Sequence, residues 1–290
     1  MPRKTTRSLR LALPKGRMQD GVFRLLSEAG LPVRAGARAY RPSLDLPELD
    51  VKILKPQNTI EMLQAGTRDL GFAGADWVDE MNADVVELLD TGLDPVRLVA
   101  AAPAALDPAA VAAERPLVVA SEYEAITRRW LEASGWPYRF VRSYGATEVF
   151  PPEDADLIVD NTATGSTLTA NNLSIVAVLQ TSSTRLYVSP GLSDEPELLA
   201  RAQEVRLLLE SVLSARERVM VEVNVSSACL EDVVSLLPCM REPTVSPLHG
   251  NGAYAVKAAV PRRDLATLIP RLRERGGTDL VVTSPSQIVS

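Results

Sequence analysis

The stretch Asp156-Leu-Ile-Val-Asp-Asn-Thr-Ala-Thr-Gly-Ser-Thr-Leu168 places a short apolar strand directly before a turn rich in small hydroxyl residues. We predict the strand over Leu157–Val159, with the carboxylate of Asp160 at its end. A helix is expected to follow, so backbone N–H groups, hydroxyls and the helix dipole converge on one spot. This arrangement predicts a nest for a 5′-phosphate, with Asp160 accepting hydrogen bonds from two ribose hydroxyls. A helix N-cap built by Thr164 and Ser166 is the alternative interpretation.

Apolar runs of this kind alternate with amphipathic stretches along the first two thirds of the chain. Strands are predicted at Leu9–Leu13, Val51–Leu54, Leu70–Ala73, Leu98–Ala101, Leu117–Ala120 and Ile175–Leu179, and helices at Met18–Ala29, Ile60–Gln64, Glu122–Ser134 and Glu195–Ser214. Short strands that are wholly apolar and alternate with helices indicate an α/β fold with buried, largely parallel sheets. The Ala- and Pro-rich stretch Pro103–Pro116 is expected to lead the chain into a second lobe.

The order of elements changes after Arg218. The predicted elements are a strand at Val219–Val225, a helix at Leu230–Leu237, a hairpin of Thr244–Leu248 and Tyr254–Ala259 around Gly250-Asn251-Gly252, a helix at Leu265–Arg275 and a strand at Leu280–Thr283. The resulting βαββαβ order is typical of a ferredoxin-like domain.

Composition limits the classes of partner. The chain has 290 residues, 46% of them hydrophobic, and a formal net charge of −6, which gives no global footprint for duplex nucleic acid. No apolar run is long enough for a membrane span. The basic segment Met1–Ser8 is not followed by the apolar core of a signal peptide before Pro14. We therefore expect a cytoplasmic protein.

Metal-ligand residues are sparse. Cys229 and Cys239 are too few for a disulfide framework or a four-ligand zinc site, and both are interpreted as small buried side chains. His249, the one histidine, lies among glycines and is expected in a loop.

Basic residues follow two of the predicted strands. Lys15-Gly-Arg17 comes after the first strand, and Lys55 comes after Val51–Leu54. Ligands of open α/β sheets bind outside the carboxyl ends of strands, and Gly16 would let the backbone approach a phosphate closely. A solvated basic turn is the alternative interpretation of Lys15-Gly-Arg17.

The segment Asp69-Leu-Gly-Phe-Ala-Gly-Ala-Asp76 ends a third strand with Gly74 and Asp76. This pattern suits a close approach to a nucleotide, and it equally suits a plain tight turn.

Five motifs, taken in their order along the chain, resemble those of a known protein family. They are Lys15-Gly-Arg17, Asp69–Asp76, Tyr144-Gly-Ala-Thr-Glu148, Asp156–Leu168 and Arg241-Glu-Pro-Thr-Val-Ser-Pro-Leu248. Together they resemble the long form of the ATP phosphoribosyltransferase family, over nearly the whole chain from Leu9 to Val289.

The resemblance implies the first step of histidine biosynthesis. ATP and phosphoribosyl diphosphate would give N1-(5-phosphoribosyl)-ATP and pyrophosphate, with Mg²⁺ bound mainly through the diphosphate and histidine as inhibitor. It also implies a two-lobed catalytic region of the type II periplasmic-binding-protein architecture: residues 1–100 with 185–215 as lobe I, and 101–184 as lobe II. A ferredoxin-like regulatory domain would occupy 216–290, in an assembly that ranges from homodimer to homohexamer.

The resemblance also assigns residues to roles. Asp160 and Glu148 would be catalytic, serving the ribose. The substrate-binding set would be Lys15, Gly16, Arg17, Lys55, Gly74, Asp76, Thr162, Ala163, Thr164, Gly165, Ser166 and Thr167. In the C-terminal domain, Thr244 and Glu222 would contact histidine, although Glu222 also fits an exposed strand residue. No residue stands out as an essential general base.

Departures from the family pattern concern the contacts to ATP. Asn58 stands where the family often has an acid, Asp94-Pro95 replaces a Gly-rich segment, and Thr169 and Asn172 replace Arg and Gly. None of these positions is a predicted phosphate contact.

Two other functions compete with this interpretation. A non-catalytic protein of the same lobe architecture could bind a small anion, which would explain the lack of a general base but not the pairing of Asp160 with a Thr-Gly-Ser-Thr turn. A phosphoribosyltransferase for another base is the second, and the C-terminal domain and Lys15-Gly-Arg17 argue against it.

Overall fold

The computed structural model describes residues 7–34, 40–46, 48–250 and 252–289. Most of the N-terminal segment Met1–Ser8 and the predicted turn residue Asn251 lie outside these residues. By its internal contacts the chain divides into two compact units, Met1–Arg24 with Leu31–Glu204, and Leu25–Gly30 with Val205–Ser290. Each unit is built around its own sheet.

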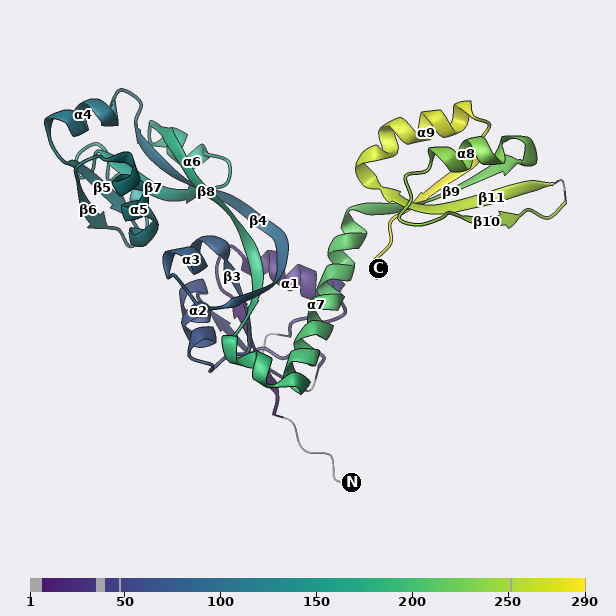
Figure 1. Cartoon of the computed structure of the whole chain (residues 1–290), viewed down its shortest axis with the longest axis horizontal. Helices are drawn as coiled ribbons and strands as arrows, with labels where there is room; N and C mark the ends of the chain where they lie inside the picture. The colour runs from purple at the N-terminus through teal and green to yellow at the C-terminus, as the bar shows by residue number, and fades with distance from the viewer. Residues whose placement is uncertain (1–6, 35–39, 47, 251, 290) are drawn as a thin grey trace. The chain divides into compact units, whose positions relative to one another are not determined.

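The first unit holds an eight-stranded sheet in the order β2-β1-β3-β8-β4-β7-β5-β6 (Figure 1). Its strands are β1 (Leu9–Pro14), β2 (Leu49–Leu54), β3 (Leu70–Gly74), β4 (Val86–Pro103), β5 (Leu117–Ser121), β6 (Tyr138–Arg142), β7 (Leu157–Thr162) and β8 (Leu173–Val188). Two parallel groups, β2-β1-β3 and β6-β5-β7, flank the central pair. This is a two-lobed α/β arrangement, as the sequence predicted.

The central pair corrects the prediction of a largely parallel sheet. β4 and β8 are antiparallel to each other, β3 is antiparallel to β8, and β7 is antiparallel to β4. The two strands run side by side from Val86↔Val188 to Pro103↔Leu173 (Figure 1). In β4 the sequence revealed the fully buried Leu98–Ala101. In β8 it revealed the apolar but largely exposed Ile175–Leu179 and missed the buried end Leu186–Val188.

Helices connect the strands of the first unit. They are α1 (Gln19–Glu28), α2 (Pro56–Gln64), α3 (Ala75–Glu80), α4 (Pro108–Glu114), α5 (Glu124–Ser134), α6 (Ser166–Ala170) and α7 (Pro196–Arg216), with short 3₁₀ turns η1 (Thr147–Val149) and η2 (Pro190–Asp194). Gly30 follows α1 and Gly135 ends α5, both at positive φ, where glycine is favoured. No helix in the described part of the chain is long and apolar enough to cross a membrane.

The stretch Pro103–Pro116, predicted only as a turn between lobes, holds a helix. α4 begins at Pro108, and the Asp107 carboxylate caps it by accepting from the Ala109 N–H at 3.0 Å. Ala throughout and Pro in the first turn both favour helix formation here. The prediction missed the helix because the segment has few large apolar residues to mark a helical period.

The second unit contains a four-stranded antiparallel sheet in the order β10-β11-β9-β12. Its elements are β9 (Arg218–Ser226), η3 (Ser227–Cys229), α8 (Leu230–Leu236), β10 (Thr244–Pro247), β11 (Ala253–Pro261), η4 (Arg262–Asp264), α9 (Leu265–Glu274) and β12 (Thr278–Thr283). Alternate valines of β9, including Val219 and Val221, are buried in one core with Leu268 and Leu272 of α9. The βαββαβ order and the ferredoxin-like prediction are confirmed.

Gly71 of β3 allows α2 to pack closely on the first sheet. A Cβ at this position would overlap the methyl group of Thr59, which is fully buried on α2, and would lie 3.4 Å from the Cβ of Ala12 on β1. Both neighbours belong to regular elements that hold the carboxyl ends of β1 and β3, so neither can move without cost.

We expect Gly71→Ala to lower the free energy of unfolding by about 1–3 kcal/mol, the usual cost of overpacking a core. Gly191→Ala is the matched control, because no heavy atom lies within 4 Å of the added Cβ. Thermal unfolding of the two variants checks this. A midpoint for Gly71→Ala equal to that of Gly191→Ala would contradict the close packing of β3 and α2.

Candidate active site

β7 presents the loop that the sequence singled out. It lies between β4 and β5, with Asp160 opposite Val99 of β4. Its start is fixed by Asp156, which accepts from both Arg115 guanidinium nitrogens at 2.6 and 2.7 Å and from the Val118 N–H at 2.8 Å. The Arg115 guanidinium keeps the pKa of Asp156 below its usual value.

The strand continues further than the apolar pattern predicted. It includes Asp160, Asn161 and Thr162, whereas the sequence placed its end at Val159. The extra ladder bonds to β4 hold Asp160 in regular extended backbone rather than in a loop. A functional carboxylate on a strand is positioned more rigidly than one on a loop.

The turn after β7 is closed by its own hydroxyls. Thr162 Oγ1 accepts from the Gly165 N–H at 2.9 Å, and the Thr164 hydroxyl donates to Ser166 Oγ at 3.0 Å. Gly165, at φ +83°, is the N-cap residue of α6 and makes no side-chain cap bond. The alternative of a cap built by Thr164 and Ser166 is thus limited to one long contact of 3.4 Å, between the Ser166 N–H and Thr164 Oγ1.

A cavity of about 330 Å³ lies against this turn. Its lining comes from three segments that are far apart in sequence, namely the turn after β1, η1 and the segment from the end of β7 into α6. The lining residues are Arg17, Glu148, Asp160, Asn161, Thr162, Ala163, Thr164, Ser166, Thr167 and Leu168. The structure therefore brings both predicted catalytic residues together with Arg17 and most of the predicted phosphate loop.

Asp160 has an unusual ionisation for a carboxylate. Burial is the main cause that raises its pKa, and the nearby charges of Glu148 and Glu122 add to it. The Asn161 N–H donates to Asp160 Oδ1 at 2.7 Å and partly opposes these effects. The net result is a pKa of about 6. A carboxylate poised in this way is typical of functional sites.

Asp76 lies elsewhere. It is 3% exposed, and both of its oxygens are occupied, because Ser182 donates to Oδ1 at 2.8 Å and the Tyr123 hydroxyl donates to Oδ2 at 2.7 Å. Tyr123 in turn accepts from Asn161 Nδ2 at 2.9 Å. Asp76 does not line the cavity, but this chain of bonds connects it to a residue that does.

The same network explains Gly74. A Cβ there would overlap the carboxylate of Asp76 and lie 3.5 Å from Ser182 Oγ. The glycine is thus required by the buried Asp76 side chain, which is the tight-turn alternative noted from the sequence. Burial and the Asp76 charge raise the pKa of the Tyr123 phenol, which therefore stays a hydrogen-bond donor.

The remaining predicted phosphate contacts are not among the residues that line the cavity. Lys15 is exposed, and its Nζ donates to the Tyr40 hydroxyl at 2.9 Å while lying over the Tyr40 ring. Gly16 has φ +88° and connects Lys15 to Arg17. Lys55 is exposed and precedes α2 as its N-cap residue.

In the second unit, Lys257 of β11 lies between Thr244 on β10 and Glu222 on β9. The Lys257 ammonium contacts Glu222 Oε1 at 2.5 Å, and Lys257 is opposite Thr244 in the β10–β11 ladder. Thr244 and Lys257 line a cavity of about 560 Å³, together with Met220, Cys239, Met240, Arg241, Glu242, Ala258, Ala259, Ile288 and Val289. Glu222 reaches this cavity only through its ion pair.

Sequence reasoning missed Asn161, Leu168 and Tyr123. Asn161 and Leu168 stand inside the quoted stretch but carried no separate signal. Tyr123 follows β5, and its ring packs against the ring of Trp77 at a centroid distance of 4.6 Å. Only the pairing of β5 with β7 brings it to Asn161, and one-dimensional patterns do not show that pairing.

The donors at the cavity do not form a metal site by themselves. Among the described residues, no group of three or more His, Cys, Asp or Glu side chains could hold a metal ion. Glu148 and Asp160 are the carboxylates that line the cavity.

Comparison with known proteins identifies the family of the chain. The sequence model of ATP phosphoribosyltransferase matches residues 55–212, and that of the HisG C-terminal domain matches residues 215–285. ATP phosphoribosyltransferase from Chlorobium phaeovibrioides is 35% identical over 277 residues, which is 94% of each chain. The enzyme of that name from Pelotomaculum thermopropionicum is 35% identical over 278 residues, covering 94% of this chain and 96% of its own.

A solved structure gives the same result for the fold. A chain of the ATP phosphoribosyl transferase (HisG:HisZ) complex from Thermotoga maritima superposes with a TM-score of 0.60 at 25% identity, covering 70% of this chain and 98% of its own. With both family models and relatives matched along nearly its full length, the chain belongs to the ATP phosphoribosyltransferase family, in the long form with a C-terminal domain, and is a pentosyltransferase of histidine biosynthesis.

Proposed function

We propose that the chain condenses ATP with 5-phosphoribosyl 1-diphosphate to give N1-(5-phosphoribosyl)-ATP and pyrophosphate. The observation that carries this proposal is the cavity in which the Asp160 carboxylate, the hydroxyl-rich turn and Arg17 face one space. A 5′-phosphate, two ribose hydroxyls and a diphosphate need those three kinds of partner. Family membership supports transfer of the phosphoribosyl group to ATP rather than to another base, or mere binding of an anion.

The proposed chemistry is displacement at the anomeric carbon by adenine N1. Positive charge builds on the ribose and negative charge on the departing pyrophosphate, so catalysis is positioning and electrostatics. Thr162, Thr164, Gly165, Ser166 and Thr167, with Ala163 between them, would hold the 5′-phosphate. Asp160 would accept from the ribose hydroxyls, and Glu148 would help to orient the same sugar.

The cationic and nucleotide contacts are also proposals. Arg17 would face the diphosphate, with Lys15, Gly16 and Lys55 contacting phosphates of either substrate as they approach. Asp76 and Gly74 were assigned to the nucleotide by resemblance. Their burial supports an indirect part, in which Asp76 positions Asn161 through Tyr123.

Members of this family need a divalent metal ion. We infer that Mg²⁺ serves here as part of the bound diphosphate substrate, since Glu148 and Asp160 do not make a complete metal site. When bound, the ion would neutralise charge on the diphosphate.

The family resemblance also supports a role for each domain. Residues 1–100 with 185–215 and residues 101–184 would form the two catalytic lobes, and residues 216–290 a histidine-sensing domain. Histidine would bind near Thr244 and Lys257, with Glu222 as a partner for its ammonium group. We further propose a cytoplasmic enzyme that changes between homodimer and homohexamer.

A turnover assay tests the reaction. With ATP, phosphoribosyl diphosphate and Mg²⁺ the absorbance rise of phosphoribosyl-ATP should appear, and Asp160→Asn should lower kcat/KM by about 100-fold or more. The same variant should unfold at an equal or higher temperature at pH 7, because the buried charge of Asp160 disfavours the folded state there. Lost stability with unchanged kcat/KM would contradict a role on the ribose.

The pKa of Asp160 predicts a pH limit. The ionised form accepts the ribose hydroxyls, so kcat/KM should fall about tenfold per pH unit below a pH of about 6. Glu122→Gln removes one charge that raises this pKa without altering the cavity lining, so the acid limb should move to lower pH. A limb that Glu122→Gln leaves unmoved, or that persists in Asp160→Asn, would assign it to another group.

Feedback inhibition is predicted to depend on the second unit. Thr244→Ala should raise the histidine concentration for half inhibition by about tenfold, the cost of one hydrogen bond, and leave the uninhibited rate unchanged. Ser235→Ala, an exposed hydroxyl change on α8, is the matched control. Equal histidine sensitivity of both variants would contradict this site.

A further inference from the structure

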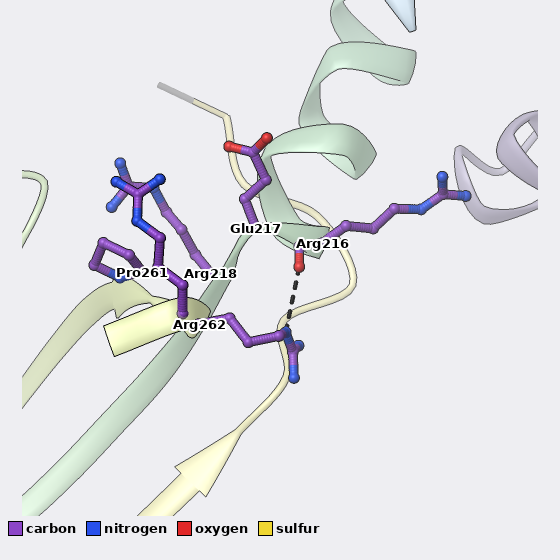
Figure 2. A pocket seen from close by; sticks show the side chains of 6 residues that line it. Arg216, Glu217, Arg218, Pro261 and Arg262 are labelled. Atoms are coloured by element: carbon purple, nitrogen blue, oxygen red, sulfur yellow. Dashed lines mark hydrogen bonds between the residues drawn. The ribbon is translucent and has the colours of Figure 1, made fainter. Parts of the chain in front are cut away.

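A second cavity lies where α7 ends and β9 begins. Its volume is about 400 Å³, and it is lined by Arg216, Glu217, Arg218, Pro261, Arg262 and Arg263. Arg216 is the last residue of α7, Arg218 opens β9, and Arg262 and Arg263 open η4 after β11. Four arginines and one glutamate from two chain segments that are remote in sequence therefore line this cavity. The side chains of Arg216 and Arg262 extend to one side of the chain and that of Arg218 to the other (Figure 2).

The charges of these arginines are only partly balanced. Arg216 forms an ion pair with Glu28 at 2.9 Å, whereas Arg263 has only a 3.8 Å contact with its neighbour Asp264. Arg218 makes no ion pair with any residue that the structure describes. Glu217, the acidic member of the lining, forms none within the same residues.

Arg262 is held in place by neutral partners. Its Nε donates to the main-chain oxygen of Arg216 at 3.3 Å, as Figure 2 shows, and its Nη2 donates to Ser284 Oγ at 3.0 Å. The main-chain N–H of Arg262 also donates to the main-chain oxygen of Glu217 at 2.8 Å. These bonds orient the guanidinium without neutralising it, so its charge remains available to a ligand.

We propose that this cavity binds a small anion carrying a diphosphate group, at a site separate from the cavity at β7. Like charges brought close together are unfavourable unless an anion lies between them, and guanidinium groups recognise phosphate oxygens through paired hydrogen bonds. The volume lies in the range of small-molecule sites. The net charge of −6 and the confinement of the arginines to one cavity favour a small ligand over a nucleic acid.

The ligand would bridge two parts of the second unit. Arg218 reaches it from the strand that follows α7, and Arg263 from the turn between β11 and α9. Binding would thus stiffen the point at which α7 enters the four-stranded sheet. This site does not depend on the proposed reaction, since none of its residues lines the β7 cavity.

Isothermal titration of the full-length protein with inorganic pyrophosphate tests this site. We expect two binding events per chain for the unaltered protein, one of them at the β7 cavity. Arg218→Ala with Arg263→Ala should weaken the second event at least tenfold and keep the first. Arg271→Ala with Arg273→Ala, which removes two exposed arginines of α9 outside the cavity, is the matched control and should keep both events.

A second titration with uridine 5′-diphosphate separates the sources of the diphosphate. If uridine 5′-diphosphate binds the arginine site more tightly than pyrophosphate does, the ligand is a nucleotide. If the two affinities are equal, the site recognises the diphosphate alone. Equal titrations of the two double variants would overturn the proposal. It would also be overturned if the arginine variant changed only the sedimentation of the protein, which would indicate a contact between chains.

Discussion

The antiparallel pairing of β4 with β8 is the constraint on which the rest of the first unit depends. It extends from Val86↔Val188 to Pro103↔Leu173, and it carries β3 on one side and β7 on the other. Because each parallel group is attached to this pair, the carboxyl end of β1 and the turn after β7 belong to one sheet. That common frame is what brings Arg17 to the cavity of Asp160 and Glu148.

Within this frame, a chain of buried hydrogen bonds connects the two parallel groups. Ser182 of β8 and Tyr123 after β5 both donate to Asp76, and Asn161 of β7 donates to Tyr123. Each member is satisfied, so the network fixes geometry at little cost. Asp160, the next residue along β7, is instead left with a buried charge and a pKa of about 6. Rigid support beside a carboxylate that accepts from the Asn161 N–H through Oδ1 and keeps further acceptor capacity suits a site for ribose hydroxyls.

The sequence predicted the lobes, the C-terminal domain and the turn after β7, because these depend on local apolar period and on small hydroxyl residues. It did not predict the length of β4 and β8, since their alternating, half-exposed residues resemble loops until a partner strand is known. The burial of Asp76 was equally hidden. A carboxylate after a strand looks the same in sequence whether it faces a ligand or, as here, accepts from Ser182 and Tyr123.

The most direct measurement is a crystal structure of the full-length protein with phosphoribosyl diphosphate bound. We expect the 5′-phosphate within hydrogen-bond distance of the hydroxyls and N–H groups of Thr162–Thr167, and both ribose hydroxyls on the carboxylate of Asp160. The diphosphate should extend toward Arg17. A ligand seated elsewhere in the first unit, with the β7 cavity empty and Asp160 free of the ribose, would contradict the site described above.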